Sequence, residues 1–237
     1  MKRKKLVLFD IDGTLIQPVG DPTGLGRFPY AIKKTFNIEV SVSYDHWPYS
    51  GVVDRGILWD LVKDKGIDKP EFDVAIPKLI ECFRLFMERA GKRRRMYESI
   101  PDALALLERV TGSGHLVYGV LTGNLGSVGI WKLAHAGVRT RFNFGLYGHE
   151  AEDRIALARQ VFDKAKKHFK RTFIPEEIFI LGDTAHDILC ARAIGATAIA
   201  VTNGWKVDTN TLIAAKPDLL VDSLMDERVL TLLGLSK

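Results

Sequence analysis

The chain has 237 residues, enough for one large domain or for a core with an insertion. Its 46% hydrophobic and 27% charged residues are the balance of a soluble globular protein. No apolar run approaches the roughly 18 residues that a membrane span requires. Two basic clusters, residues 2–5 and 92–95, carry much of the net charge of +5.

Short apolar runs alternate with amphipathic stretches along most of the chain. Continuous apolar character predicts strands that are buried on both faces, as in a parallel sheet. The predicted strands are residues 5–10, 115–123, 177–183 and 196–202, with 217–221 as a weaker fifth. Helical patterns cover 101–111, 127–136, 152–168, 185–194 and 209–215. This repeated strand–helix order predicts an α/β fold with a doubly wound, Rossmann-like parallel sheet.

The region from 18 to 98 interrupts this order. Its patterns are mostly helical, at 30–36, 54–66 and 74–91, and it has no convincing buried strand. We therefore expect a core made of residues 1–17 and 99–237, with an inserted α-helical domain at 18–98.

Polar residues end three of the predicted strands. Asp10 and Asp12 follow the first strand, the segment "LTGN" with Thr122, Gly123 and Asn124 ends the second, and Asp183 and Asp187 follow the third. In open α/β sheets, ligands bind beyond the carboxyl ends of the strands, so these side chains are expected to converge. Each motif alone could be a turn or a helix cap, but all three in this order favour one common site.

At least three carboxylates would lie together at that site. They would repel one another strongly unless a hard cation were present. Magnesium prefers oxygen ligands and binds through a few carboxylates together with substrate phosphates. The sequence therefore predicts a Mg²⁺ site.

The motifs "DIDGTL" (10–15), "LTGN" (121–124) and "GDTAHD" (182–187) resemble, in the same order, the signatures of the haloacid dehalogenase (HAD) superfamily. The segment 187–205 is similar to its phosphatase members, notably those like phosphoglycolate phosphatase. The resemblance covers 1–17 and about 99–237, and the helical insertion lies where this family places a cap domain. It implies a magnesium-dependent phosphatase that hydrolyses a small phosphorylated metabolite.

The resemblance also implies roles for individual residues. Asp10 would be the nucleophile that forms an aspartyl-phosphate. Asp12 would be the general acid and then the general base, and its presence favours phosphoryl transfer over dehalogenation because an alcohol leaving group needs a proton. Thr122, Gly123 and Asn124 would bind the phosphoryl group. Asp10, Asp183 and the Asp12 carbonyl would bind the metal, and Asp187 would hold a metal-bound water or orient its neighbours.

One position departs from the family pattern. The family places a lysine before the helix that precedes the "GD" strand, whereas this chain reads "GHEAEDRIALARQ" (148–160) without one. Arg154 is the expected substitute, because it carries the charge and can bind two oxygens. The alternative is a surface arginine paired with Glu150 or Asp153.

In the insertion, "YSGVVDRGIL" (49–58) resembles the substrate loop of members with a helical cap. Arg55 is the candidate contact for a substrate anion, with an arginine of a surface helix as the alternative. His46, Trp47 and Tyr49 could line the pocket, but we expect them to pack the cap.

Other classes of function remain as alternatives. A phosphomutase could keep the same core residues, and a low-turnover binding protein could keep the fold. A nucleic-acid partner is not expected, because no aromatic residues alternate with the basic clusters. The four apolar residues 6–9 are too few for a signal peptide, and the distant Cys82 and Cys190 suit a reducing cytoplasm.

Overall fold

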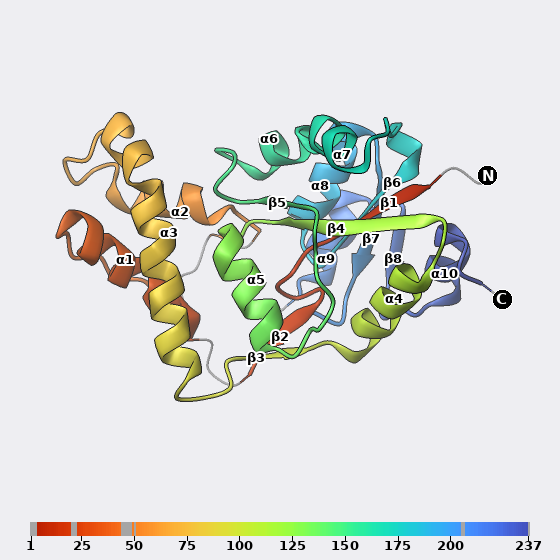
Figure 1. Ribbon diagram of the computed structural model, residues 1–237, viewed down its shortest axis with the longest axis horizontal. Coiled ribbons are helices and arrows are strands. Elements are labelled where there is room, and N and C mark those ends of the chain that lie inside the picture. Colours follow the sequence, from red (N-terminus) through yellow and green to blue (C-terminus); the bar gives the residue numbers. More distant parts are fainter. Residues whose placement is uncertain (1–3, 20–22, 44–48, 50, 205–206, 237) are drawn as a thin grey trace.

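The computed structural model describes residues 4–19, 23–43, 49, 51–204 and 207–236 (Figure 1). His46, Trp47 and the first part of the basic cluster at 2–5 lie outside the described residues. No helix among the described residues is long and apolar enough to span a membrane.

The predicted parallel sheet is confirmed. Six parallel strands stand in the order β5-β4-β1-β6-β7-β8. Their bounds are β1 Lys5–Phe9, β4 Leu116–Thr122, β5 Gly145–Tyr147, β6 Ile178–Gly182, β7 Thr197–Val201 and β8 Leu219–Val221. The five predicted strands are all present, and β5 is an additional three-residue edge strand that the sequence analysis missed.

Helices cover both faces of this sheet (Figure 1). The side chains of β1 alternate between two buried clusters: Leu6 and Leu8 pack in one, and Val7 and Phe9 in the other. The first cluster includes side chains of α6 (Arg154–Arg159), α7 (Val161–Phe169), α8 (Ala185–Ile194) and α9 (Thr209–Ala215). The second includes those of α4 (Pro101–Gly112), α5 (Gly126–His135) and α10 (Glu227–Leu233). Burial on both faces explains why the strand sequences are continuously apolar rather than alternating.

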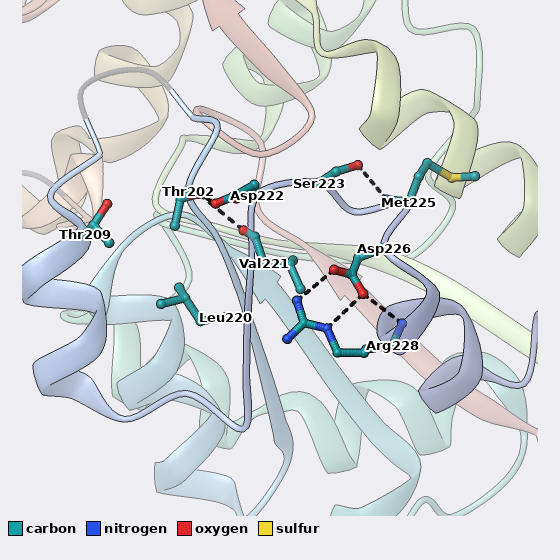
Figure 2. Close-up of a pocket in the computed structure, with 9 residues that line it drawn as sticks. All are labelled: Thr202, Thr209, Leu220, Val221, Asp222, Ser223, Met225, Asp226 and Arg228. Atoms are coloured by element: carbon teal, nitrogen blue, oxygen red, sulfur yellow. Dashed lines mark hydrogen bonds and ion pairs between the residues drawn. The ribbon is translucent and has the colours of Figure 1, made fainter.

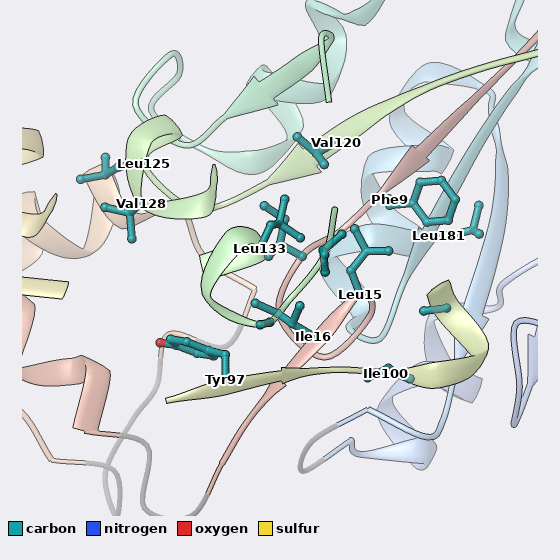
Figure 3. Packing of buried hydrophobic residues seen from close by; sticks show 14 of the residues in the cluster. Phe9, Leu15, Ile16, Tyr97, Ile100, Val120, Leu125, Val128, Leu133 and Leu181 are labelled. Carbon is teal, nitrogen blue, oxygen red and sulfur yellow. The ribbon is translucent and has the colours of Figure 1, made fainter. Parts of the chain in front are cut away.

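Figure 3 shows the second of these clusters beside the site. Phe9 of β1 lies against Leu181 of β6, and Leu15 and Ile16 continue the apolar packing toward Leu133 of α5. The loop that follows β1 is therefore held between the sheet and α5.

The helices of the insertion lie to one side of the sheet (Figure 1). They are α1 (Arg27–Phe36), α2 (Asp54–Val62) and α3 (Lys69–Gly91), and α3 packs against both α1 and α5. A two-stranded antiparallel ribbon of β2 (Ile16–Pro18) and β3 (Tyr97–Ser99) joins this cap to the core. The expected domain boundaries, at 17/18 and 98/99, fall within that ribbon.

Two further details differ from the sequence expectation. The helical stretch 152–168 is divided into α6 and α7 at Gln160, whose side chain donates to the Glu150 carbonyl at 3.0 Å. The helix α10 at the end of the chain was not predicted. The basic residues 92–95 are exposed in the connection between α3 and β3.

Candidate active site

The register of the sheet brings three strand ends together. Phe9 of β1 is paired with Val120 of β4 on one side and with Leu181 of β6 on the other. The residues that follow these positions therefore emerge side by side at the carboxyl edge of the sheet. The backbone N–H of Asp10 also donates to the Leu181 carbonyl at 2.9 Å, which fixes the start of the loop.

A tight turn follows β1 and carries the chain past Asp183. Gly13 has a φ of +79°, and a Cβ at this position would lie 2.0 Å from Asp183 Oδ2. Glycine is required there for both reasons, since it accepts positive φ and leaves room for the carboxylate. Thr14 Oγ1 donates to Asp183 Oδ1 at 3.3 Å.

Three buried carboxylates form the centre of the site. Asp10, Asp183 and Asp187 each place an oxygen within 4.8 Å of the others. Burial, with the neighbouring charges of Asp187 and Asp12, raises the pKa of Asp10 to about 7 against the attraction of Arg154. Burial and the charges of Asp10 and Asp187 also raise the pKa of Asp183 well above its ordinary value. The cluster is thus short of positive charge.

These donors fit magnesium. The cluster offers carboxylate oxygens, which Mg²⁺ prefers, and the raised pKa values of Asp10 and Asp183 mean that a cation would stabilise their ionised forms. Asp187 differs from the other two because both its oxygens already accept hydrogen bonds, Oδ1 from Arg154 and Oδ2 from the N–H and hydroxyl of Thr184. An orienting role for Asp187 agrees with this arrangement better than direct metal binding.

Arg154 lies inside the acidic cluster rather than on the surface. It begins α6, which Asp153 caps by accepting from the Ala156 N–H at 2.8 Å. Its Nη2 is 3.0 Å from Asp10 Oδ1 and also pairs with Asp187. Burial opposes its charge, but the two carboxylates outweigh this and raise the pKa of Arg154. The alternative of a surface arginine paired with Glu150 or Asp153 does not match this placement.

Asp12 occupies a different environment from Asp10. Its Oδ2 accepts from Lys132 Nζ at 2.7 Å and from Asn124 Nδ2 at 2.7 Å, while the side chain is 40% exposed. Burial alone would raise the pKa of Asp12, but the Lys132 ammonium and these hydrogen bonds hold that pKa below its ordinary value. The two carboxylates of the "DID" motif therefore have pKa values shifted in opposite directions.

The end of β4 supplies hydrogen-bond donors beside the carboxylates. Thr122 is fully buried, and its Oγ1 accepts from Asn124 Nδ2 at 2.8 Å. Within the described chain this hydroxyl acts only as an acceptor, so its proton is available to a bound oxyanion. Lys132 Nζ also donates to Asn124 Oδ1 at 2.7 Å, which fixes the orientation of the amide.

The cap is docked directly onto this strand end. The Asp54 N–H donates to the Gly123 carbonyl at 2.7 Å, and Asp54 Oδ2 accepts from the Leu125 N–H at 3.1 Å. Asp54 Oδ1 pairs with Arg27 of α1 at 3.1 Å. A Cβ on Gly123 would lie only 2.6 Å from the Val52 carbonyl oxygen. A side chain at position 123 would therefore separate the cap from the core.

A Gly123→Ala variant is expected to lose about 10- to 100-fold in kcat/KM for the chain's substrate, because displacement of the cap misplaces the groups around the reacting atoms. Steady-state kinetics measures the loss. Gly112→Ala is the matched control, since nothing lies within 4 Å of the added Cβ at the end of α4. Equal activity of both variants with the wild-type protein would contradict the docking role.

A cavity of about 340 Å³ lies between core and cap. The core lines it with Asp10, Asp12, Thr122, Asn124, Lys132, Arg154 and Asp183. The cap and the ribbon line it with Leu25, Arg27, Tyr49, Val52, Ile57 and Tyr97. Tyr49 packs against the hydrophobic cluster, as expected, and it also lines the cavity, while its hydroxyl donates to Asp60 Oδ2.

Arg55 does not line this cavity. Its Nη2 lies 2.9 Å from Asp73 in the cap and 2.7 Å from Glu152 in the core, and Nη1 donates to the His149 carbonyl. The side chain therefore joins cap and core through ion pairs. That Arg55 contacts a substrate anion stays a prediction, and its position outside the cavity does not favour it.

The site also contains three charged residues that are not expected from the sequence, namely Arg27, Asp54 and Lys132. All three are buried. Lys132 shares the buried face of α5 with Val128, Gly129 and Leu133, and a lysine on the apolar stripe of a helix is a signal that could have indicated it. Arg27 occupies a similar position on the buried face of α1.

A second hollow of about 390 Å³ lies beyond the ends of β7 and β8 (Figure 2). Its charged groups are already paired: Arg228 contacts both oxygens of Asp226, and Thr202 donates to Asp222. It contains none of the residues that the sequence motifs indicate.

Comparison with known proteins agrees with the motifs. The HAD-hydrolase-like family model matches residues 156–226, which include the "GDTAHD" segment. A phosphoglycolate phosphatase from Nitrosococcus oceani is 23% identical over 231 residues, which cover 95% of this chain and 96% of the relative. Phosphoglycolate phosphatase 1 from Pseudomonas aeruginosa is 26% identical over 94% of this chain and 78% of the relative.

Solved structures share the fold over nearly the whole chain. A predicted phosphoglycolate phosphatase from Haemophilus somnus aligns with a TM-score of 0.65 and 20% identity, covering 98% of this chain and 99% of that one. A hydrolase from Pseudomonas syringae aligns with a TM-score of 0.63 and 19% identity, covering 94% and 95% of the two chains. With the three motifs gathered at one sheet edge and the helical cap in place, the chain is similar in sequence and fold to hydrolases of the haloacid dehalogenase superfamily.

Proposed function

We propose that this protein is a magnesium-dependent phosphatase that hydrolyses a small phosphorylated metabolite similar to phosphoglycolate. The observation that carries the proposal is that two neighbouring carboxylates lie in different environments. Asp10 is buried in the acidic cluster with Arg154, whereas Asp12 faces the cavity and is held by Lys132. One is placed to attack phosphorus and the other to handle the proton of the leaving group.

Asp10 would attack phosphorus while Asp12 gives its proton to the departing oxygen. An aspartyl-phosphate on Asp10 and a free alcohol result. Asp12, now a carboxylate, would take a proton from water, which attacks the phosphorus and regenerates Asp10. The Thr122 hydroxyl and Arg154 would bind the phosphoryl oxygens as charge develops on them.

Asp10, Asp183 and the main-chain carbonyl of Asp12 would hold Mg²⁺, with Asp187 orienting Arg154 and Thr184 nearby. The bound ion supplies positive charge that offsets the charge of the cluster and of the transferring group. We also place the protein in the cytoplasm, because Cys82 and Cys190 are both free and buried, as suits a reducing compartment.

The first experiment is phosphate release from a panel containing phosphoglycolate, a sugar phosphate, a nucleoside monophosphate and pyrophosphate, with Mg²⁺ or with EDTA. We expect release only with Mg²⁺, and most from one small ester, because the cavity is only about 340 Å³. Asp10→Asn serves as the blank. Absence of release from every ester would contradict the proposal.

A phosphomutase is the second candidate. A protein from Bacteroides vulgatus that is named for β-phosphoglucomutase activity shares the fold with a TM-score of 0.63 and 19% identity. In a mutase, the phosphoryl group on Asp10 would pass to an added sugar phosphate rather than to water. Formation of a sugar bisphosphate in the same assay distinguishes the two.

A further inference from the structure

Lys132 is a buried cation that the reaction described above leaves without a role. It lies on α5, outside all three sequence motifs, and is only 3% exposed. Its ammonium makes two hydrogen bonds of 2.7 Å, one to Asp12 Oδ2 and one to Asn124 Oδ1. The ammonium also lies over the ring of Tyr97, 5.2 Å from its centroid.

The three polar groups form a closed ring of hydrogen bonds. Asn124 Nδ2 donates to Asp12 Oδ2 at 2.7 Å, so Lys132 and Asn124 hold the same carboxylate oxygen. Asp12 Oδ1 makes no hydrogen bond within the described part of the chain. Because the Asp12 side chain is 40% exposed and lines the cavity, the oxygen that is left over is the one available to a ligand.

We infer that Lys132 is a positioning residue for proton transfer: it fixes Asp12 through Oδ2 so that Oδ1 faces the leaving oxygen of the substrate. This inference rests on the proposed phosphatase function. It assigns to α5 a part in catalysis that none of the three motifs carries.

The chemistry explains why a fixed cation helps at this point. As the bond between phosphorus and the leaving oxygen breaks, the proton moves from the Asp12 carboxyl to that oxygen and negative charge develops on Asp12. The Lys132 ammonium and the Asn124 amide are already in place to stabilise this charge, so no reorganisation is needed. In the second half of the reaction, water gives a proton to Asp12 while the water oxygen forms a bond to phosphorus, and the bond between phosphorus and the Asp10 oxygen breaks.

The test uses the different proton demands of two leaving groups. An alkyl phosphate must be protonated as it departs, whereas 4-nitrophenyl phosphate releases a stable phenolate without a proton. In a Lys132→Met variant, kcat/KM for the alkyl phosphate that the wild-type protein hydrolyses best is expected to fall about 100-fold. For 4-nitrophenyl phosphate we expect a change of less than about threefold.

Lys164→Met is the matched control. This substitution also removes an ion pair, the one between Lys164 and Glu150, but Lys164 lies outside the cavity. It should leave both activities unchanged. Lys132→Gln retains a donor without the charge and provides a second variant if the methionine variant fails to fold, as judged by thermal melting. We expect an intermediate loss for it, again confined to the alkyl ester.

A double-mutant cycle separates a role through Asp12 from a general structural effect. Adding Lys132→Met to Asp12→Asn should cause little further loss with the alkyl phosphate, because the group that Lys132 positions is already gone. Equal losses on both esters, additive losses in the double variant, or a change in KM alone would overturn the inference. If the wild-type protein hydrolyses neither ester, the proposed function fails instead, and this comparison identifies which of the two is wrong.

Discussion

An Asp10→Asn variant is expected to lose phosphatase activity by a factor on the order of 10⁴–10⁶, because the amide cannot attack phosphorus. The variant keeps nearly the same shape, and its side chain remains beside Arg154 and the end of β1. Phosphate release with the best ester of the panel measures the loss. Asp163→Asn, in α7 and outside the cavity, is the control and should retain full activity.

The same substitution is expected to stabilise the metal-free protein near neutral pH. The pKa of Asp10 is raised from 3.8 to about 7, so the folded protein holds this proton over a pH range in which the unfolded chain has released it. More protons are then bound to the folded state, and the free energy of unfolding falls as pH rises from about 4 to 7. Asp183, whose pKa is also raised, contributes in the same direction. Asparagine at position 10 does not titrate, so it removes the contribution of Asp10 to this fall in the free energy of unfolding.

Thermal melts of the wild-type protein and of Asp10→Asn in EDTA, across that pH range, test whether the substitution stabilises the metal-free protein. The two melting temperatures should agree near pH 4 and separate toward pH 7, where the variant is more stable by up to about 4 kcal/mol. The histidines titrate in both proteins, so their contribution to the pH dependence of stability cancels in the comparison. Added Mg²⁺ should raise the melting temperature of the wild-type protein more than that of the variant. A variant less stable than the wild-type protein at pH 7 would show that the Asp10–Arg154 pair outweighs burial and repulsion.

The positions of Asp10, Thr122 and Asp183 could be predicted because their convergence depends only on the topology of the sheet. Continuous apolar runs indicate parallel strands, and parallel strands place their carboxyl ends along one edge. Nothing more than the strand order is required to bring these residues together. The strand β5 and the ribbon of β2 and β3 were missed because each has only three residues and none contains a continuous apolar run like the one that indicates β8.

The residues that the cap and α5 contribute depend on packing rather than on local pattern. Asp54 and Arg27 are 27 positions apart and pair only because α1 and α2 lie together in the cap. Lys132 and Asp12 are 120 positions apart. Arg55 follows Asp54 directly in the first turn of α2, yet its guanidinium pairs with Glu152 and Asp73. Which of two neighbouring charged residues enters the site is decided by helix rotation against the core, and spacing along the chain does not encode this.

Arg154→Met is expected to be the second most damaging substitution. The arginine forms ion pairs with both Asp10 and Asp187 at a site where all three side chains are at least nine-tenths buried. Removing one partner of a buried ionic group leaves uncompensated charge, at a cost of about 3–5 kcal/mol in the free energy of unfolding at neutral pH. Loss of a group that stabilises developing charge should also lower kcat by about 10²–10³-fold.

Arg154→Lys separates the charge from the geometry. A lysine restores a positive charge but not the planar group that reaches Asp10, Asp187 and the Leu121 carbonyl together, so partial recovery of both stability and kcat is expected. Arg192→Met is the control: its ion pair with Asp218 is exposed, and its loss should cost less than about 1 kcal/mol without affecting kcat. Because Mg²⁺ would supply charge to the same carboxylates, the melting temperature of Arg154→Met should respond more strongly to Mg²⁺ than that of the wild-type protein. If Arg154→Met keeps wild-type kcat and stability, the cluster does not depend on this arginine, and the position usually filled by lysine in the family has no functional equivalent at residue 154.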